Sequence, residues 1–132
     1  MELGKKFAGA INCMDGRVQD AVAIFLRKKL GVDYVDAITE PGPDLILAEN
    51  TDAAVVVNIK KRVGISLEKH GAKTVAIVAH ADCAGNPVTK EEHLDQLQRA
   101  KETVANFGFE VEIILVWVDL INGNWVAEEV IK

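Results

Sequence analysis

Short apolar runs alternate along the chain with longer stretches in which apolar residues recur every three or four positions. A short apolar run bounded by charged or turn residues predicts a buried strand, and residues 7–13, 33–39 and 74–80 have this form. The run from 74 to 80 is apolar on both faces, as expected of a central strand in a parallel sheet. A further β-rich run covers residues 110–119.

Helical periodicity occupies the segments between these runs. The expected helices cover residues 18–30, 51–71 and 89–106. Gly31 supplies a stop for the first helix, because glycine readily adopts the left-handed conformation that ends helices. Thr89 and Glu92 have the spacing of a capping box at the start of the third.

Two turn signals complete the pattern. Glu40-Pro41-Gly42-Pro43 is expected to be a loop, because two prolines fit neither a helix interior nor a central strand. Asn122-Gly123-Asn124 separates the run at 110–119 from a second one at 125–131, which favours a hairpin. The predicted fold is therefore α/β: a single domain over residues 1–132, with a mostly parallel β-sheet flanked by helices and a C-terminal antiparallel hairpin.

Composition and charge narrow the class of protein. The 132 residues are 49% hydrophobic and carry 20 acidic against 15 basic side chains, a net charge of −5 that argues against nucleic acid as a partner. The sequence contains no stretch of eighteen uncharged apolar residues, so no membrane-spanning helix is predicted. The N-terminal residues make a poor signal peptide, so a cytoplasmic location is expected. The basic groups Arg27-Lys28-Lys29 and Lys60-Lys61-Arg62 are expected to be solvated helix faces.

Chemically unusual residues follow two of the predicted strands. One strand ends in Cys13-Met14-Asp15-Gly16-Arg17 and another in His80-Ala81-Asp82-Cys83. If these strands are neighbours, Cys13, His80 and Cys83 meet at one edge of the sheet. Two thiolates and one imidazole favour zinc, and a site with only three protein ligands keeps its fourth position for water, as catalytic zinc sites do.

Asp15 and Arg17 extend this candidate site. Asp15 lies two residues beyond Cys13, close enough to approach the fourth position, and the planar fork of Arg17 suits a carboxylate. Held by Arg17, Asp15 would stay ionised and accept a hydrogen bond from a zinc-bound water; released, it could ligate the zinc. Arg17 could instead pair with Asp20 as an ordinary first-turn residue.

Cys-x-Asp-x-Arg at one strand end, followed about sixty residues later by His-x-x-Cys at another, resembles the β-class carbonic anhydrase family. Residues 66–83 resemble the helix, strand and zinc segment of that family, and Trp117-Val118-Asp119 with residues 122–124 resembles its closing hairpin. The resemblance covers most of the chain.

The resemblance implies a function for each of these residues. Cys13, His80 and Cys83 would be the zinc ligands, with Asp15 and Arg17 as the catalytic dyad. The implied activity is that of a lyase that hydrates carbon dioxide reversibly to bicarbonate by a zinc-bound hydroxide. The resemblance also implies a homodimer or a higher homo-oligomer.

Other interpretations of the same residues stay open. The family typically has Arg-Asn-x-Gly-Asn where this chain has residues 39–43, which motivates a non-catalytic zinc-binding protein as an alternative. A hydrolase of another small heterocumulene, carbonyl sulfide or carbon disulfide, would use the same machinery. Cys13 and Cys83 could also be buried thiols or a redox pair. Asp82 either supports a ligand or is an exposed loop acid.

The two remaining histidines lie outside the motifs. His70 is near the end of one expected helix and His93 is four residues into another. Both are expected to face solvent rather than to bind a metal.

Overall fold

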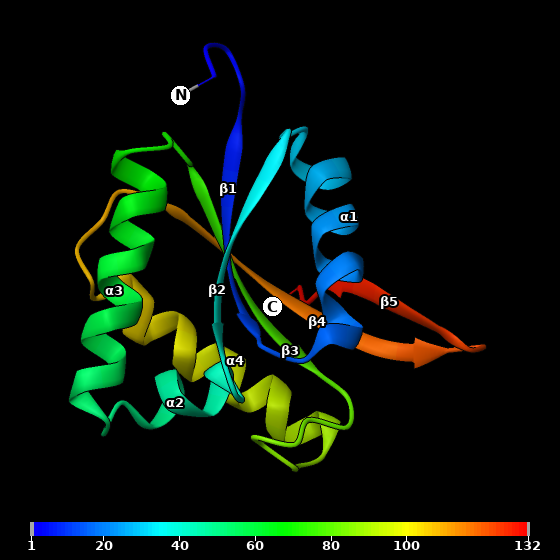
Figure 1. The fold of residues 1–132 in the computed structure, drawn as a ribbon. Helices are drawn as coiled ribbons and strands as arrows, with labels where there is room; N and C mark the ends of the chain where they lie inside the picture. The colour runs from blue at the N-terminus through cyan, green and yellow to red at the C-terminus, as the bar shows by residue number, and fades with distance from the viewer. Residues whose placement is uncertain (1, 132) are drawn as a thin grey trace.

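Five strands form one sheet in the order β2-β1-β3-β4-β5 in the computed structural model, which describes residues 2–131 (Figure 1). The strands are β1 (Phe7–Cys13), β2 (Tyr34–Glu40), β3 (Thr74–His80), β4 (Glu112–Ile121) and β5 (Asn124–Glu129). β1 pairs in parallel with β2 and β3, β3 pairs in parallel with β4, and only β5 is antiparallel to its neighbour. The predicted α/β class, with a mostly parallel sheet and a C-terminal hairpin, is confirmed.

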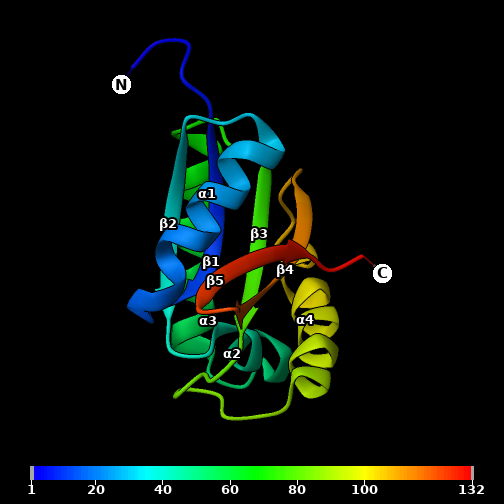
Figure 2. The same cartoon turned by 90° about the vertical axis from the view of Figure 1, so that its right-hand side faces the viewer.

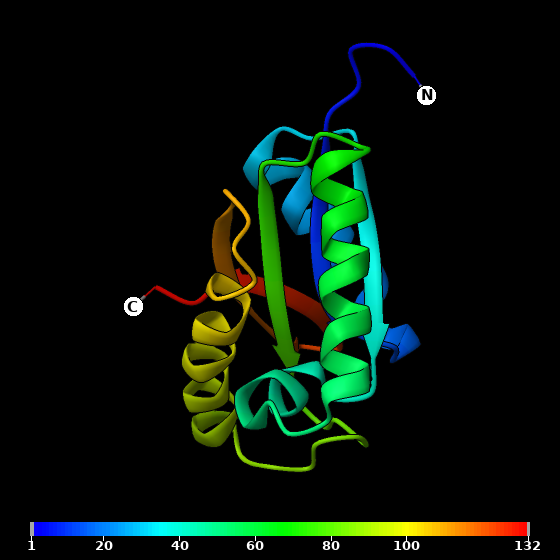
Figure 3. The same ribbon diagram turned by 90° about the vertical axis from the view of Figure 1, so that its left-hand side faces the viewer.

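Helices cover both faces of this sheet. They are the 3-10 turn η1 (Gly16–Val18), α1 (Gln19–Leu30), α2 (Pro43–Glu49), α3 (Ala53–Glu68) and α4 (Lys90–Ala105). Figure 2 shows α1 and β5 in front of one face, and Figure 3 shows α2, α3 and α4 on the other. No helix within residues 2–131 is long and apolar enough to cross a membrane.

Two apolar layers hold the helices to the sheet. β3 is buried along its whole length, and because successive side chains of a strand alternate in direction, Ile77 packs under α3 and α4 while Val78 packs under α1. Val22 and Leu26 of α1 lie in the second layer, at the helical spacing predicted for that face. Because helices cover both faces of β3, the strand has no polar face in the sequence.

The turns follow the predicted chemistry, with one exception. Asn122 and Gly123 both have positive φ, 51° and 81°, as a two-residue hairpin turn requires. Pro43, expected to lie in the loop at residues 40–43, begins helix α2 instead. Pro43 takes the first position of that helix, where its missing N–H leaves no hydrogen bond unmade, so the proline that argued against a helix interior is compatible with a helix start.

The order of the strands creates a switch point at the site. The chain begins in β1, moves to β2 on one side, and returns to β3 on the other side of β1. The carboxyl ends of β1 and β3 are therefore neighbours where the chain direction across the sheet reverses, the position at which open α/β sheets place their ligands.

Candidate metal centre

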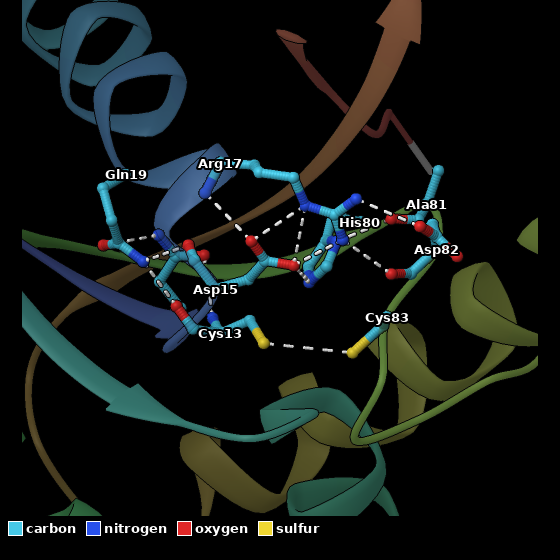
Figure 4. Close-up of polar contacts among 9 residues, drawn as sticks. Cys13, Asp15, Arg17, Gln19, His80, Ala81, Asp82 and Cys83 are labelled. Carbon is cyan, nitrogen blue, oxygen red and sulfur yellow. Dashed lines mark hydrogen bonds and ion pairs between the residues drawn. The ribbon is translucent and has the colours of Figure 1, made fainter.

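Three potential ligand atoms meet beyond the carboxyl ends of β1 and β3 (Figure 4). Cys13 is the last residue of β1, His80 is the last residue of β3, and Cys83 follows three residues later. The two sulfur atoms lie 3.9 Å apart, and the ligand atoms of all three residues lie within 4.8 Å of one another. All three side chains are buried, and both cysteines are free thiols. The predicted convergence of these residues is present in the structure.

The imidazole of His80 has the orientation and tautomer of a metal ligand. Its Nδ1 atom lies 2.7 Å from the carbonyl oxygen of Ala81, which can only accept, so Nδ1 carries the hydrogen. In the neutral ring Nε2 then carries the lone pair, and this atom is buried without a hydrogen-bond partner among the described residues. Buried polar atoms are rarely left unpaired, and a backbone carbonyl holding the far nitrogen is the usual arrangement of metal-binding histidines. With the two sulfurs, this donor set fits zinc.

The thiol of Cys83 also stays protonated at neutral pH without a nearby cation, because its pKa is raised. Burial, together with a smaller contribution from Cys13 beside it, raises the pKa of Cys83 to about 11. The backbone N–H groups of Gly85 and Asn86 act in the opposite direction, because they hydrogen-bond to the sulfur. A divalent metal between the sulfurs would remove the repulsion between them, so the electrostatics agree with the donor set.

A carboxylate held by an arginine borders this cluster. Arg17 donates from Nη2 to Asp15 Oδ2 at 2.7 Å and from Nε to Oδ1 at 3.1 Å, and its backbone N–H donates to Oδ1 at 2.9 Å. The guanidinium lowers the pKa of Asp15 to about 2, so this carboxylate is ionised at neutral pH. Oδ2 lies 4.0 Å from Nε2 of His80. Of the two partners considered for Arg17, the structure selects Asp15 rather than Asp20.

Arg17 is itself fixed by groups from two other elements. Nη1 donates to Oδ2 of Asp82 and Nη2 to the backbone carbonyl of the same residue, both at 3.0 Å. The guanidinium carbon lies 4.9 Å from the ring centre of Trp125 on β5, a cation–π contact. Asp82 is thus an exposed loop acid that also supports the dyad. Trp125 was not predicted, since no local pattern links it to a residue 108 positions earlier.

A family model described as "Putative carbonic anhydrase" matches residues 3–131. The chain belongs to this carbonic anhydrase family. The resemblance stated from the sequence is thereby confirmed. The crystal structure of the β-carbonic anhydrase CafA of the fungal pathogen Aspergillus fumigatus is similar at 16% sequence identity and a TM-score of 0.44, over 96% of this chain and 75% of that one. No curated protein matches the sequence.

Two polar side chains that sequence reasoning left out brace the β1 end in this member of the carbonic anhydrase family. Gln19 donates from Nε2 to the carbonyl oxygens of Cys13 and Asp15, at 2.7 and 2.8 Å. Asn12 accepts from the backbone N–H of Cys13 at 2.8 Å. Asn12 is buried in an otherwise apolar strand, and a buried polar residue directly before a candidate ligand was the signal available in the sequence.

Glu40 is paired rather than free. Its carboxylate forms an ion pair with Arg62 of α3, so the altered loop of this carbonic anhydrase family member does not present an unpaired acid to the site. The pair also corrects the prediction for Lys60-Lys61-Arg62. Lys60 and Lys61 are exposed, but Arg62 is half-buried because it reaches the end of β2.

The prediction that both other histidines face solvent is wrong. His93 is 1% exposed and lies 2.6 Å from the carboxylate of Asp44, while the partly buried His70 lies 2.7 Å from Asp36. His93 precedes Leu97 by four residues on the buried face of α4, so helical periodicity already placed it on the core side. Neither residue joins the Cys13, His80 and Cys83 cluster.

Proposed function

We propose that this protein is a zinc-dependent lyase that hydrates carbon dioxide reversibly to bicarbonate. One observation carries the proposal: the buried cluster of Cys13, His80 and Cys83, with an unpartnered Nε2, lies beside an aspartate that an arginine keeps ionised. Membership of a carbonic anhydrase family supports the same activity. The class of reaction is inferred from the cluster, the ionised Asp15 and the family together, since the cluster alone would also suit a purely structural metal.

Cys13 and Cys83 would hold the metal through their sulfurs and His80 through Nε2. A zinc ion held by three protein ligands lowers the pKa of a coordinated water to about 7 and so supplies a nucleophile at neutral pH. The protein adds a fixed geometry to that chemistry. Ala81 holds the ring of His80 by Nδ1, and Gln19 holds the backbone on both sides of Met14.

Asp15 orients the reacting water in this proposal. Its Oδ2 lies 4.0 Å from Nε2 of His80, near enough to accept a hydrogen bond from a water on the same cluster. A carboxylate with a pKa of about 2 accepts hydrogen bonds without taking up the proton at neutral pH. Arg17 keeps that oxygen in place through Nη2 and Nε, and Asp82 and Trp125 keep Arg17 in place.

The proposal is tested by metal analysis together with stopped-flow carbon dioxide hydration between about pH 7 and 9. We expect close to one zinc per chain and hydration that Asp15→Ala abolishes while zinc content is retained. Asp20→Asn is the matched control, because it removes an exposed acid from the adjacent helix and leaves the cluster intact. Stoichiometric zinc without hydration above background contradicts the proposal.

A non-catalytic zinc protein is the second candidate. The observation that favours it is the short separation between Asp15 and His80, because a carboxylate that left Arg17 would be close enough to fill the fourth zinc position. This candidate expects zinc in every chain, no hydration, and no exchange of a bound anion. If zinc is present and carbon dioxide is not hydrated, carbonyl sulfide and carbon disulfide are the next substrates to assay.

We also propose a homodimer or a higher homo-oligomer, and a cytoplasmic location. β2 and β5 are the outer strands of the sheet, and an uncovered edge strand favours pairing with another chain. The exposed residues Leu120, Ile121 and Val126 of the hairpin add apolar surface at one of these edges. Sedimentation equilibrium measures the assembly, and a molar mass of one chain at micromolar concentration contradicts the dimer.

A further inference from the structure

A second buried polar cluster lies next to the metal centre. It joins Asp44 of α2, His93 and Gln96 of α4, and Asn86 from the loop between Cys83 and α4. Asp44, Asn86 and His93 are each only 1% exposed, and Gln96 is 6% exposed. Charged and amide side chains are rarely buried so completely unless they are hydrogen-bonded to one another.

Asn86 is at the centre of this cluster. Its Nδ2 atom donates to Oδ1 of Asp44 at 3.1 Å and to Oε1 of Gln96 at 2.6 Å. The other oxygen of Asp44 lies 2.6 Å from Nδ1 of His93, and because a carboxylate accepts, that nitrogen is the donor. Asp44 is therefore held by His93 on one side and holds Asn86 on the other.

Asn86 in turn connects the cluster to Cys83. The backbone N–H of Asn86 donates to the carbonyl oxygen of Cys83 at 3.3 Å, and the N–H groups of Gly85 and Asn86 hydrogen-bond to its sulfur. The loop also packs directly against the start of α2. A Cβ atom on Gly85 would lie 2.7 Å from the carbonyl carbon of Pro41, and one on Gly42 would lie 2.8 Å from the Cβ of Asn86. The Cys83 loop thus cannot shift without moving α2.

A purely structural role does not account for the free energy that is lost by burying these polar side chains. Nε2 of His93 and Oδ1 of Asn86 are buried without a hydrogen-bond partner among the described residues. Leaving such atoms unpaired is unfavourable, and apolar side chains of similar volume would join α2 to α4 at least as stably. Apolar contacts are not directional, whereas the hydrogen bonds to Asn86 fix the orientation of its side chain.

We propose that Asp44 and His93 are positioning residues for the metal centre: acting through Asn86, they hold the Cys83 loop so that its sulfur faces Cys13 and His80. The inference rests on the proposed function in one respect, that the centre binds a metal. Neither residue touches the ligand atoms, so their effect is on where one of the three ligands lies. Partners that orient metal ligands typically change metal affinity by about 10–100-fold when they are removed.

Two substitutions of His93 separate hydrogen bonding from packing. His93→Asn retains a side-chain N–H at the position of Nδ1 and removes the rest of the ring. His93→Phe retains a ring against Trp117, whose ring centre lies 5.4 Å from that of His93, and removes the donor to Asp44. If the cluster positions Cys83, zinc dissociation constants measured by chelator competition rise about 10–100-fold in His93→Phe and change little in His93→Asn. The reverse order, or equal affinities, overturns the proposal.

Two further proteins keep the test independent of folding. Asp44→Asn removes one of the hydrogen bonds without changing side-chain size and is expected to weaken zinc binding as His93→Phe does. Val63→Ala, on the buried face of α3, destabilises the apolar core without removing any hydrogen bond of the polar cluster and is expected to retain the native zinc affinity. Equal losses of affinity in Val63→Ala and Asp44→Asn at matched urea midpoints would show an effect of stability alone and overturn the proposal.

Cobalt substitution supplies a spectroscopic measurement that does not depend on activity. Thiolate-to-cobalt absorption and the d–d bands report the number and geometry of the bound sulfurs. We expect the bands to shift in His93→Phe and Asp44→Asn and to match the native protein in His93→Asn and Val63→Ala. If the native protein binds neither zinc nor cobalt, the proposed function fails; if it binds both and the four variants match it, only the positioning role fails.

Discussion

The Oδ2 atom of Asp15 lies 4.0 Å from the unpartnered Nε2 atom of His80 and accepts a 2.7 Å hydrogen bond from Arg17. One oxygen atom therefore borders the ligand cluster and the guanidinium at the same time. Any change that loosens Arg17 moves this oxygen relative to the proposed metal position. We therefore propose that the Asp15–Arg17 pair and the cluster of Cys13, His80 and Cys83 act as one unit, whose parts can be tested separately.

Replacing Arg17 by lysine tests the geometry of the dyad rather than its charge. Arg17 uses Nε, Nη1 and Nη2 in different directions, toward Asp15 and Asp82, and the single ammonium group of lysine cannot reproduce that fork. We expect kcat/KM for carbon dioxide hydration to fall about 100-fold, with zinc content unchanged. Arg99→Lys is the matched control, because Arg99 pairs with Asp95 on the exposed side of α4. Equal activity of Arg17→Lys and the native protein would refute this role.

Zinc affinity is expected to fall as the pH is lowered. Burial raises the pKa of Cys83 to about 11, so its thiol keeps its proton between pH 6 and 9 in the metal-free protein and must release it to bind zinc. The apparent dissociation constant therefore rises by at least about tenfold for each unit of pH decrease. Calorimetric titration in buffers of different ionisation enthalpy counts the protons released. A dissociation constant independent of pH in this range contradicts the prediction.

The pairing of Asp15 with Arg17 is expected to stabilise the metal-free fold only above a defined pH. The guanidinium lowers the pKa of Asp15 from 3.8 to about 2, and a lowered carboxyl pKa adds stability that is complete above the unfolded value and lost as pH falls through the folded one. Urea midpoints of Asp15→Asn and the native protein should differ at pH 5 and converge between about pH 4 and 2. The exposed-acid variant Asp20→Asn should show no such convergence. A difference that persists unchanged to pH 2 would assign the effect of Asp15 to something other than its charge.

Gly85→Ala is expected to disturb the fold and the metal centre together. The added Cβ would lie 2.7 Å from the backbone of Pro41, so the loop or the start of α2 must shift. Inserting atoms into a tightly packed position typically costs about 1–3 kcal/mol of unfolding free energy. Gly16→Ala is the control, since no heavy atom lies within 4 Å of its Cβ position and its φ is not positive. Denaturant unfolding and chelator competition measure both effects, and native values for Gly85→Ala would contradict the close packing seen here.

Much of the candidate site could be predicted because its parts are local. Cys13, Asp15 and Arg17 lie within five residues, and a strand end followed by a tight turn brings such neighbours together. His80 and Cys83 are close in sequence for the same reason. That these two groups meet was a conditional prediction, because the sequence does not state that β1 and β3 are adjacent.

The supporting groups were beyond prediction for a physical reason. Trp125 reaches Arg17 only after the hairpin turns back beside α1, and Asp44 reaches His93 only because α2 forms under α4. A seven-residue helix such as α2 is too short to be stable alone, so packing rather than propensity decides its existence. His93 is the intermediate case, since helical spacing placed it on the buried face but no local signal showed its partner.

The sequence by itself determined the α/β class, the strands and longer helices, and the candidate ligand and dyad residues at two strand ends. These follow from side-chain periodicity and from contacts within a few residues, which the chain encodes locally. Only the tertiary structure decided that β1 and β3 lie side by side, that Arg17 also pairs with Asp82, and that Asp44 and His93 form a buried pair. Those relationships depend on how the helices pack over the whole sheet, and each joins residues whose separation in sequence carries no signal of their contact.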